Sequence, residues 1–160
     1  MGLDMYLEKC NRKAWSYKDL DIDNVKENNP ALYEEIKPFI TVRGNYYKWE
    51  SIFEEVGYWR KANAIHKWFV DNVQGGVDNC GYYEVTKEKA HELLVVCRNV
   101  KTEPQYVAKS LLPTQEGFFF GSTDYDEGYF DDIEETITIL TKALEETDFD
   151  KEMLVYSSSW

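Results

Sequence analysis

Cysteine and histidine are scarce in this chain of 160 residues. The three cysteines, Cys10, Cys80 and Cys97, form no CxxC pair, and the two histidines are His66 and His91. An odd number of cysteines without such a pair is typical of a reducing compartment rather than of a disulfide scaffold. So few candidate ligands exclude the common zinc motifs. We therefore expect no metal site, and the sequence identifies no cofactor.

Long apolar segments are missing as well. No stretch reaches the roughly 18 apolar residues that a transmembrane helix requires. The opening residues, Met1 to Leu7, lack the basic region and apolar run of a signal peptide. Tyr6 stands where a myristoylation signal has Ser or Thr. We therefore expect a cytoplasmic protein without a membrane partner.

The sequence also lacks clusters of basic residues. The formal net charge is -12, and residues 124–152 hold 12 acidic and only two basic residues. Binding to a phosphate backbone needs clustered Lys and Arg, so we expect no direct nucleic-acid partner. Such a surface would attract cations or a basic protein, or imitate nucleic acid. The commoner outcome is a solvated acidic helix that aids solubility.

Apolar residues are nevertheless plentiful. They make up 43% of the chain, and aromatic residues alone make up 16%. This share excludes disorder, and the length suits one compact core, so residues 1–160 are predicted to form a single globular domain. Part of the aromatic excess serves the core, and the rest is available to line a pocket or a contact surface.

Hydrophobic periodicity predicts a mixture of strands and helices without a regular alternation. Strands are expected at 3–7, 82–85, 117–121 and 153–156, the last beside the first, with a hairpin of 39–43 and 46–49 around Gly44-Asn45. Helices are expected from Pro30 behind an Asn29 cap, at 56–73, after Thr86, at 104–111 and, with the clearest stripe, from 126 to 146. The pattern predicts an α+β fold, in which a small antiparallel or mixed sheet packs with three to five helices.

Two polar residues interrupt the apolar face of the predicted helix 56–73. Asn63 and His66 are three positions apart, so they are neighbours on the helix surface. They could bind a ligand by hydrogen bonds, with His66 as a general base. The alternative is a satisfied core pair that fixes a loop such as 74–76, because buried polar groups usually find partners within the protein.

The segment Gly121 to Glu127 follows a predicted buried strand and precedes a helix. Backbone N–H groups at a helix N-terminus favour anions. The carboxylates of Asp124, Asp126 and Glu127 suit a hard cation such as Mg²⁺ better. The alternative is ordinary capping, in which Ser122, Thr123 or Asp124 caps the helix and the acidic residues favour the positive end of its dipole.

Several motifs resemble a family of small, uncharacterised phage and prophage proteins. They are the opening residues 1–7, the segments 55–66, 68–70, 73–76, 112–114, 117–123 and 125–127, and the closing residues 158–160. The resemblance covers nearly the whole chain. It implies a phage or prophage setting, but no activity. Its motif residues include Arg60, Asn63, His66, Asp126 and Glu127, which the residue patterns also single out.

The favoured function is a non-catalytic phage accessory protein that binds a small polar ligand or a host protein. The first alternative is a metal-dependent enzyme that acts on a nucleotide or another phosphate-containing substrate, with His66 as its base. The second is an acidic decoy of a nucleic-acid-binding protein, built on the helix from Asp126 to Glu146. The expected ligand-binding residues are Tyr58, Trp59, Arg60, Asn63, His66, Gln74, Ser122, Asp124, Tyr125 and Asp126.

Overall fold

The computed structural model describes residues 2–44, 46–49 and 53–160. The described residues form seven α-helices, one 3-10 turn and six strands. In chain order these are β1 (Asp4–Asn11), α1 (Arg12–Tyr17), α2 (Ile22–Asn28), α3 (Pro30–Ile36), the 3-10 turn Lys37–Phe39, β2 (Ile40–Arg43), β3 (Tyr46–Trp49), β4 (Phe53–Arg60), α4 (Asn63–Asn72), β5 (Tyr83–Val85), α5 (Lys87–Thr102), α6 (Pro104–Leu111), α7 (Glu127–Glu146) and β6 (Glu152–Ser159). The predicted α+β class is confirmed.

The main sheet has four antiparallel strands in the order β4-β1-β6-β5. The predicted pairing of the C-terminal strand with the first strand is confirmed, because β1 pairs with β6 along its whole length. Leu3, Met5 and Leu7 are fully buried, whereas Asp4, Tyr6 and Glu8 on the opposite face are only partly buried. This period-2 alternation places the apolar side chains of this part of β1 on one face of the sheet and its polar side chains on the other.

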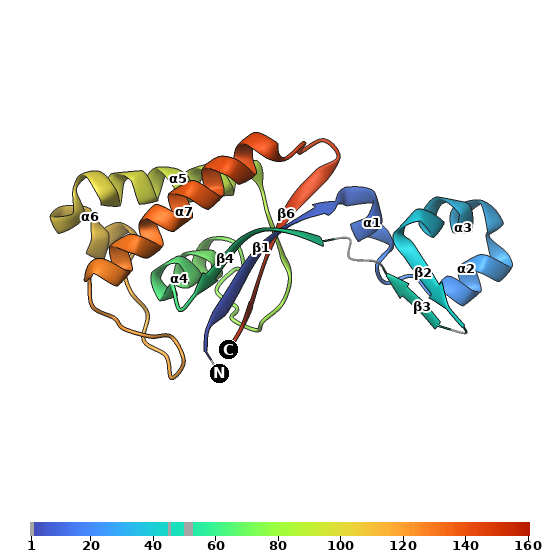
Figure 1. Ribbon diagram of the computed structural model, residues 1–160, viewed down its shortest axis with the longest axis horizontal. Coiled ribbons are helices and arrows are strands. Elements are labelled where there is room, and N and C mark those ends of the chain that lie inside the picture. Colours follow the sequence, from blue (N-terminus) through green and yellow to red (C-terminus); the bar gives the residue numbers. More distant parts are fainter. Residues whose placement is uncertain (1, 45, 50–52) are drawn as a thin grey trace.

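Helices cover the apolar face. Figure 1 shows α5 and α7 lying side by side along the molecule, with α4 below α7 and beside β4. Ile133 and Leu140 of α7 enter the core, as the predicted stripe requires. Gly57 lets α7 approach β4 closely, because a Cβ at this position would collide with the side chain of Ile139.

The predicted helix 56–73 is wrong in its first half. Residues 53–60 are strand β4, in which the buried Gly57 and Trp59 alternate with the exposed Tyr58 and Arg60. The helix α4 begins only at Asn63. A period-2 strand followed by a buried helix imitated one long amphipathic helix. Even Trp68 is only 6% exposed, because most of α4 is buried.

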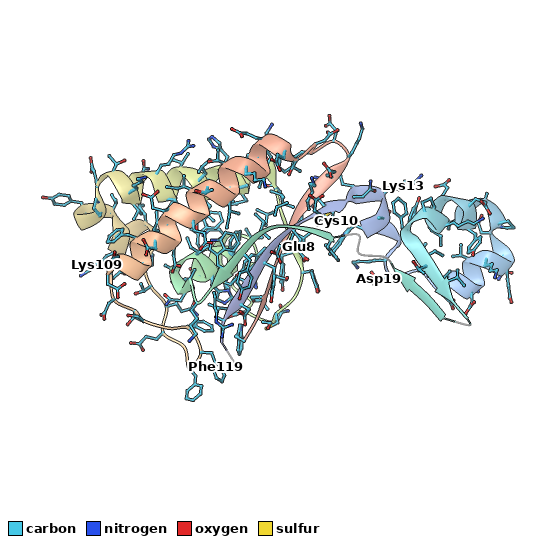
Figure 2. All side chains as sticks on the ribbon, viewed as in Figure 1. Glu8, Cys10, Lys13, Asp19, Lys109 and Phe119 are labelled. Carbon is cyan, nitrogen blue, oxygen red and sulfur yellow. The ribbon has the colours of Figure 1, made fainter. Side chains whose placement is uncertain are left out.

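The predicted buried strand 117–121 is also wrong. These residues lie in the loop between α6 and α7, and Phe118 is 94% exposed. Figure 2 labels Phe119 at the end of this loop. Phe120 alone of the three phenylalanines is buried. Three consecutive aromatic residues show no alternation of apolar and polar positions. Such a run does not distinguish a buried strand from a loop that buries a single side chain.

A smaller apolar cluster occupies the end of the elongated molecule opposite to α6 (Figure 1). Its buried residues are Ile22, Val25, Ile36 and Ile40, from α2, α3 and β2. The predicted hairpin is confirmed by antiparallel pairing of β2 with β3, and its turn residue Asn45 lies outside the described residues. That residues 1–160 form a single domain stays a prediction.

Side-chain caps begin several helices. Asn29 accepts a hydrogen bond from Leu32 N at α3 and Thr86 from Lys89 N at α5, as the sequence predicts. The cap of α7 is Asp126, which accepts from Tyr129 N, rather than the expected Ser122, Thr123 or Asp124. The short helices α1 and α2 lie in a polar segment for which no element is predicted. Within the described residues, no helix is long and apolar enough to cross a membrane.

Candidate functional site

Three segments that are far apart in the sequence meet at a pocket of about 260 Å³. One is the turn from β4 into α4, the second is the loop between α6 and α7, and the third is the first part of α7. Five of the expected ligand-binding residues line this pocket: Arg60, Asn63, Ser122, Asp124 and Asp126. The structure thus brings together the two motifs that the sequence leaves separate.

Asn63 fixes the loop that forms the pocket. Its Nδ2 donates to the carbonyl oxygens of Phe120 at 2.9 Å and Ser122 at 2.8 Å. Its Oδ1 accepts from Gln115 N at 2.9 Å. Asn63 is 4% exposed, and its amide already has protein partners on both sides. Its role is therefore to position the wall, as in the core-pair alternative, although the loop that it fixes is 115–122 rather than 74–76.

Lys61 makes the sharp turn from strand to helix at the pocket mouth. Its φ of 64° lies in the left-handed region, which costs a residue with a Cβ about 1 to 2 kcal/mol. Gly121 faces it with φ 85°, and a Cβ on Gly121 would come within 3.2 Å of the Lys61 Cβ. The two segments therefore approach each other closely, and Lys61 is one of the residues that line the pocket.

Asp132 is the most unusual group in the pocket. Burial raises the pKa of this carboxyl to about 7, and the nearby carboxylates of Glu135, Asp131 and Asp126 add to the effect. Among the described residues, no hydrogen bond or ion pair reaches its carboxylate. The nearest guanidinium in the pocket, that of Arg60, pairs with Asp4 at 2.9 Å instead. A half-buried carboxylate without a partner is available to a ligand.

The raised pKa of Asp132 predicts a pH-dependent stability difference. Its folded value of about 7 exceeds the ordinary 3.8, so the folded state holds more protons between these values and loses stability as the pH rises through that window. Asp132→Asn is expected to raise the free energy of unfolding by about 1 to 2 kcal/mol at pH 8, after allowance for solvent screening. The gain is expected to vanish near pH 4, as measured by urea unfolding.

Asp131→Asn is the matched control for this measurement. Asp131 is the exposed neighbour on the same helix, and its replacement removes the same charge. We expect it to change the free energy of unfolding by less than about 0.5 kcal/mol. Equal effects of the two substitutions at pH 8, or a constant effect of Asp132→Asn between pH 4 and pH 8, would contradict the assignment.

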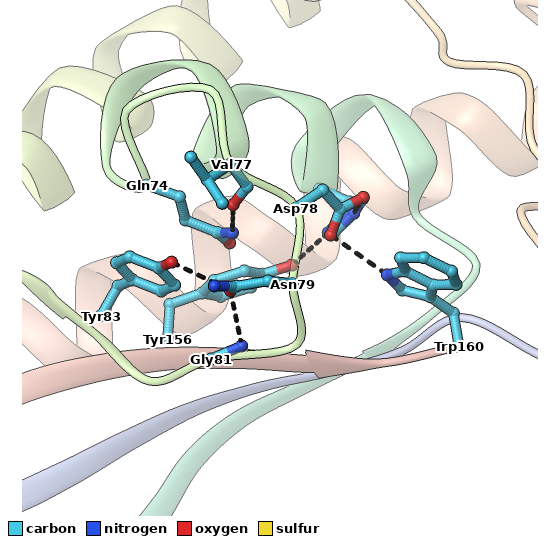
Figure 3. A network of polar contacts seen from close by, with 9 residues as sticks. Gln74, Val77, Asp78, Asn79, Gly81, Tyr83, Tyr156 and Trp160 are labelled. Atoms are coloured by element: carbon cyan, nitrogen blue, oxygen red, sulfur yellow. Dashed lines mark hydrogen bonds and ion pairs between the residues drawn. The ribbon is translucent and has the colours of Figure 1, made fainter.

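His66 does not share this pocket, contrary to expectation. It is fully buried, with Nδ1 2.7 Å from the Tyr156 hydroxyl and Nε2 2.9 Å from Asp78 Oδ2. Asp78 Oδ1 accepts from Trp160 Nε1 at 3.1 Å (Figure 3). The carboxylate acts as an acceptor on both oxygens, which places the His66 proton on Nε2 and leaves Nδ1 to accept from Tyr156. The network joins α4 to the 74–81 loop and to β6.

The other expected residues are dispersed. Trp59 is fully buried and donates through Nε1 to Thr136 Oγ1 at 2.9 Å, so it belongs to the core. Gln74 is 5% exposed and donates to Val77 O, which closes its own loop (Figure 3). Tyr125 accepts from Thr114 N and fixes the loop behind the pocket. Tyr58 lies on the opposite, polar face of the sheet, with its hydroxyl bonded to Asp4.

The acidic loop forms caps rather than a visible cation site. Asp126 Oδ1 accepts from Tyr129 N, and Ser122 Oγ accepts from Asp124 N. Across the described residues, no group of three or more His, Cys, Asp or Glu side chains is arranged to hold a metal ion. The loop thus caps the helix, as the alternative expects, but through Asp126 instead of Ser122, Thr123 or Asp124.

Sequence reasoning missed Asp132 and Tyr129, and it also missed the left-handed backbone of Lys61. Asp132 stands beside Ile133 at the edge of the apolar stripe, where a carboxylate is partly desolvated, and this position is the one signal that could have identified it. Lys61 has no sequence signal, because a left-handed lysine is dictated by its surroundings. Tyr129 is 6% exposed, and its hydroxyl donates to Leu112 O.

Comparison of the chain with models of protein families, with curated proteins and with solved structures found no match. Function is therefore inferred from the geometry and chemistry of the pocket.

Proposed function

We propose that this protein binds a small polar molecule in the pocket between α4, the 112–126 loop and α7, without catalysing a reaction. The observation that carries the proposal is the unpartnered, half-buried carboxylate of Asp132 within a formed pocket. A carboxylate in this position is best satisfied by an amino group, which can donate a charge-assisted hydrogen bond. The ligand class is thus a small molecule that carries an amino group.

The rim supports a ligand of mixed polarity. Lys61 is exposed at the mouth and has no ion-pair partner among the described residues, so it can attract an anionic or carbonyl group on the same molecule. Amino acids and nucleotides combine both features. The phage or prophage setting and the cytoplasmic location implied above are part of this proposal. The metal-dependent and decoy alternatives gain no specific support from the described geometry.

A thermal-shift screen with amino acids, polyamines and nucleotides tests the proposal. A ligand at 100 times its dissociation constant adds about 2.7 kcal/mol of stability, which raises the unfolding midpoint by several degrees. We expect a shift in the wild-type protein and in Asp131→Asn, and its loss in Asp132→Asn. A flat screen, or a ligand whose shift persists in Asp132→Asn, would contradict binding at this carboxylate.

A further inference from the structure

The polar face of the sheet carries a second pocket, independent of the first. Aromatic side chains are exposed here: Tyr58 is 37% exposed and Tyr82 is 57% exposed. A recess of about 370 Å³ lies here, lined by Tyr6, Glu8, Cys80, Tyr82 and residues 157–159. Figure 2 labels Glu8 on β1, near the middle of the molecule.

Each aromatic wall of this recess is supported by a second ring. Tyr6 contacts Tyr58 with ring centroids 5.3 Å apart. Tyr82 stacks on Phe53 at 5.5 Å and an interplanar angle of 20°. Phe53 in turn packs against the apolar cluster that contains Val155. The walls are thus held in place before any ligand arrives, which reduces the entropy lost on binding.

A single carboxylate lies between these walls. Glu8 is partly buried, and among the described residues it has no hydrogen bond or ion pair. Burial raises the pKa of Glu8, and the neighbouring Glu55 raises it further. The adjacent lysine, Lys9, points its charge to Glu54 and Glu152 instead. Serine hydroxyls at Ser157 and Ser159 complete the polar lining.

A carboxylate between aromatic rings is the chemistry that recognises an organic cation. Guanidinium fits it better than ammonium, because it is planar, stacks on rings, is weakly hydrated and can pair with a carboxylate through two N–H groups. The recess is open and its rim is aromatic, which suits a side chain delivered by a protein more than a free small molecule. The net charge of -12 favours encounter with a basic partner.

We propose that this recess binds an arginine side chain of a partner protein, with Glu8 as the counter-ion and the Tyr6 and Tyr82 rings as its walls. The site does not involve the pocket at Asp132, so either proposal can fail without the other.

The test is an NMR titration of isotope-labelled protein with the peptide acetyl-Gly-Arg-Gly-amide. The control peptide replaces arginine by citrulline, which has nearly the same shape and no charge. We expect the arginine peptide to shift the amide signals of Tyr6, Tyr82 and Ser157. The citrulline peptide is expected to bind at least tenfold more weakly, because it lacks both the ion pair and the cation–π contact. A tenfold change in affinity corresponds to about 1.4 kcal/mol.

Variants locate the site and exclude unfolding as an explanation. Glu8→Gln keeps the shape and is expected to fold, because it removes a charge that the folded state disfavours. Glu8→Gln and Tyr82→Leu should each weaken binding of the arginine peptide at least tenfold. Glu145→Gln removes the same charge from an exposed position on α7, and it should leave binding unchanged. Equal binding of both peptides, unchanged binding by Glu8→Gln, or shifts confined to the helices would overturn the proposal.

Discussion

Replacement of Asn63 by alanine is expected to lower the free energy of unfolding by about 3 to 5 kcal/mol, because each buried backbone group left without a partner costs about 1 to 3 kcal/mol. The amide serves three such groups, the carbonyls of Phe120 and Ser122 and the N–H of Gln115. Chemical unfolding in urea gives the free energy directly, and the midpoint should fall without a large change in slope.

A second substitution at the same position separates donors from acceptor. Asn63→Asp keeps the acceptor for Gln115 N but turns the donating group into an acceptor that faces two carbonyl oxygens. Asn63→Asp is expected to lower the free energy of unfolding at least as much as Asn63→Ala. The matched control is Asn72→Ala on the same helix, which loses one hydrogen bond to Trp68 O and should cost less than about 1 kcal/mol. Similar losses for Asn63→Ala and Asn72→Ala would show that the loop is held by other contacts.

Replacement of His66 by alanine is the other large effect, with an expected loss of about 3 to 5 kcal/mol. The change leaves a cavity and removes a partner from Tyr156 and from Asp78 at once. Burial already raises the pKa of Tyr156 well above its usual value, so the hydroxyl stays protonated and needs an acceptor. Differential scanning calorimetry and urea unfolding both measure the loss.

The chain supplies its own control for this experiment. His91 is the other histidine and is exposed on α5, so His91→Ala should change the free energy of unfolding by less than about 0.5 kcal/mol. A double-mutant cycle with Tyr156→Phe isolates the hydroxyl–imidazole contact, and we expect an interaction energy of about 1 to 2 kcal/mol. If His66→Ala loses no more than His91→Ala, the network of Figure 3 contributes little to stability.

The two large effects have different consequences for the proposed site. Asn63 holds the wall of the pocket at Asp132, so its loss should abolish ligand binding together with stability. His66 lies outside the pocket and anchors the 74–81 loop. At temperatures where His66→Ala remains folded, we expect its ligand affinity to be close to that of the wild type. Comparison of the two variants therefore distinguishes a positioning residue from one that acts on stability alone.

The sequence by itself determined the elements whose signal is local. The alternation of Leu3, Met5 and Leu7, the caps at Asn29 and Thr86, and the stripe of α7 each depend on residues within a few positions, and all were predicted correctly. The α+β class follows from these elements. Asn63 was identified because a polar side chain interrupts an apolar face, and Asp126 because it is an acidic residue at the start of a helix.

The tertiary structure decided what local pattern leaves open. Residues 53–60 form a strand because residues 4–10 of β1, far away in the sequence, pair with them, although the same apolar spacing fits a helix. Asn63 holds a loop by hydrogen bonds, and the carboxylate of Asp132 is half-buried without a partner among the described residues. Both results depend on segments that are distant in the sequence and meet only in the folded chain. Hydrogen bonding and desolvation depend on what lies within a few ångströms in space, and only the folded chain sets those distances.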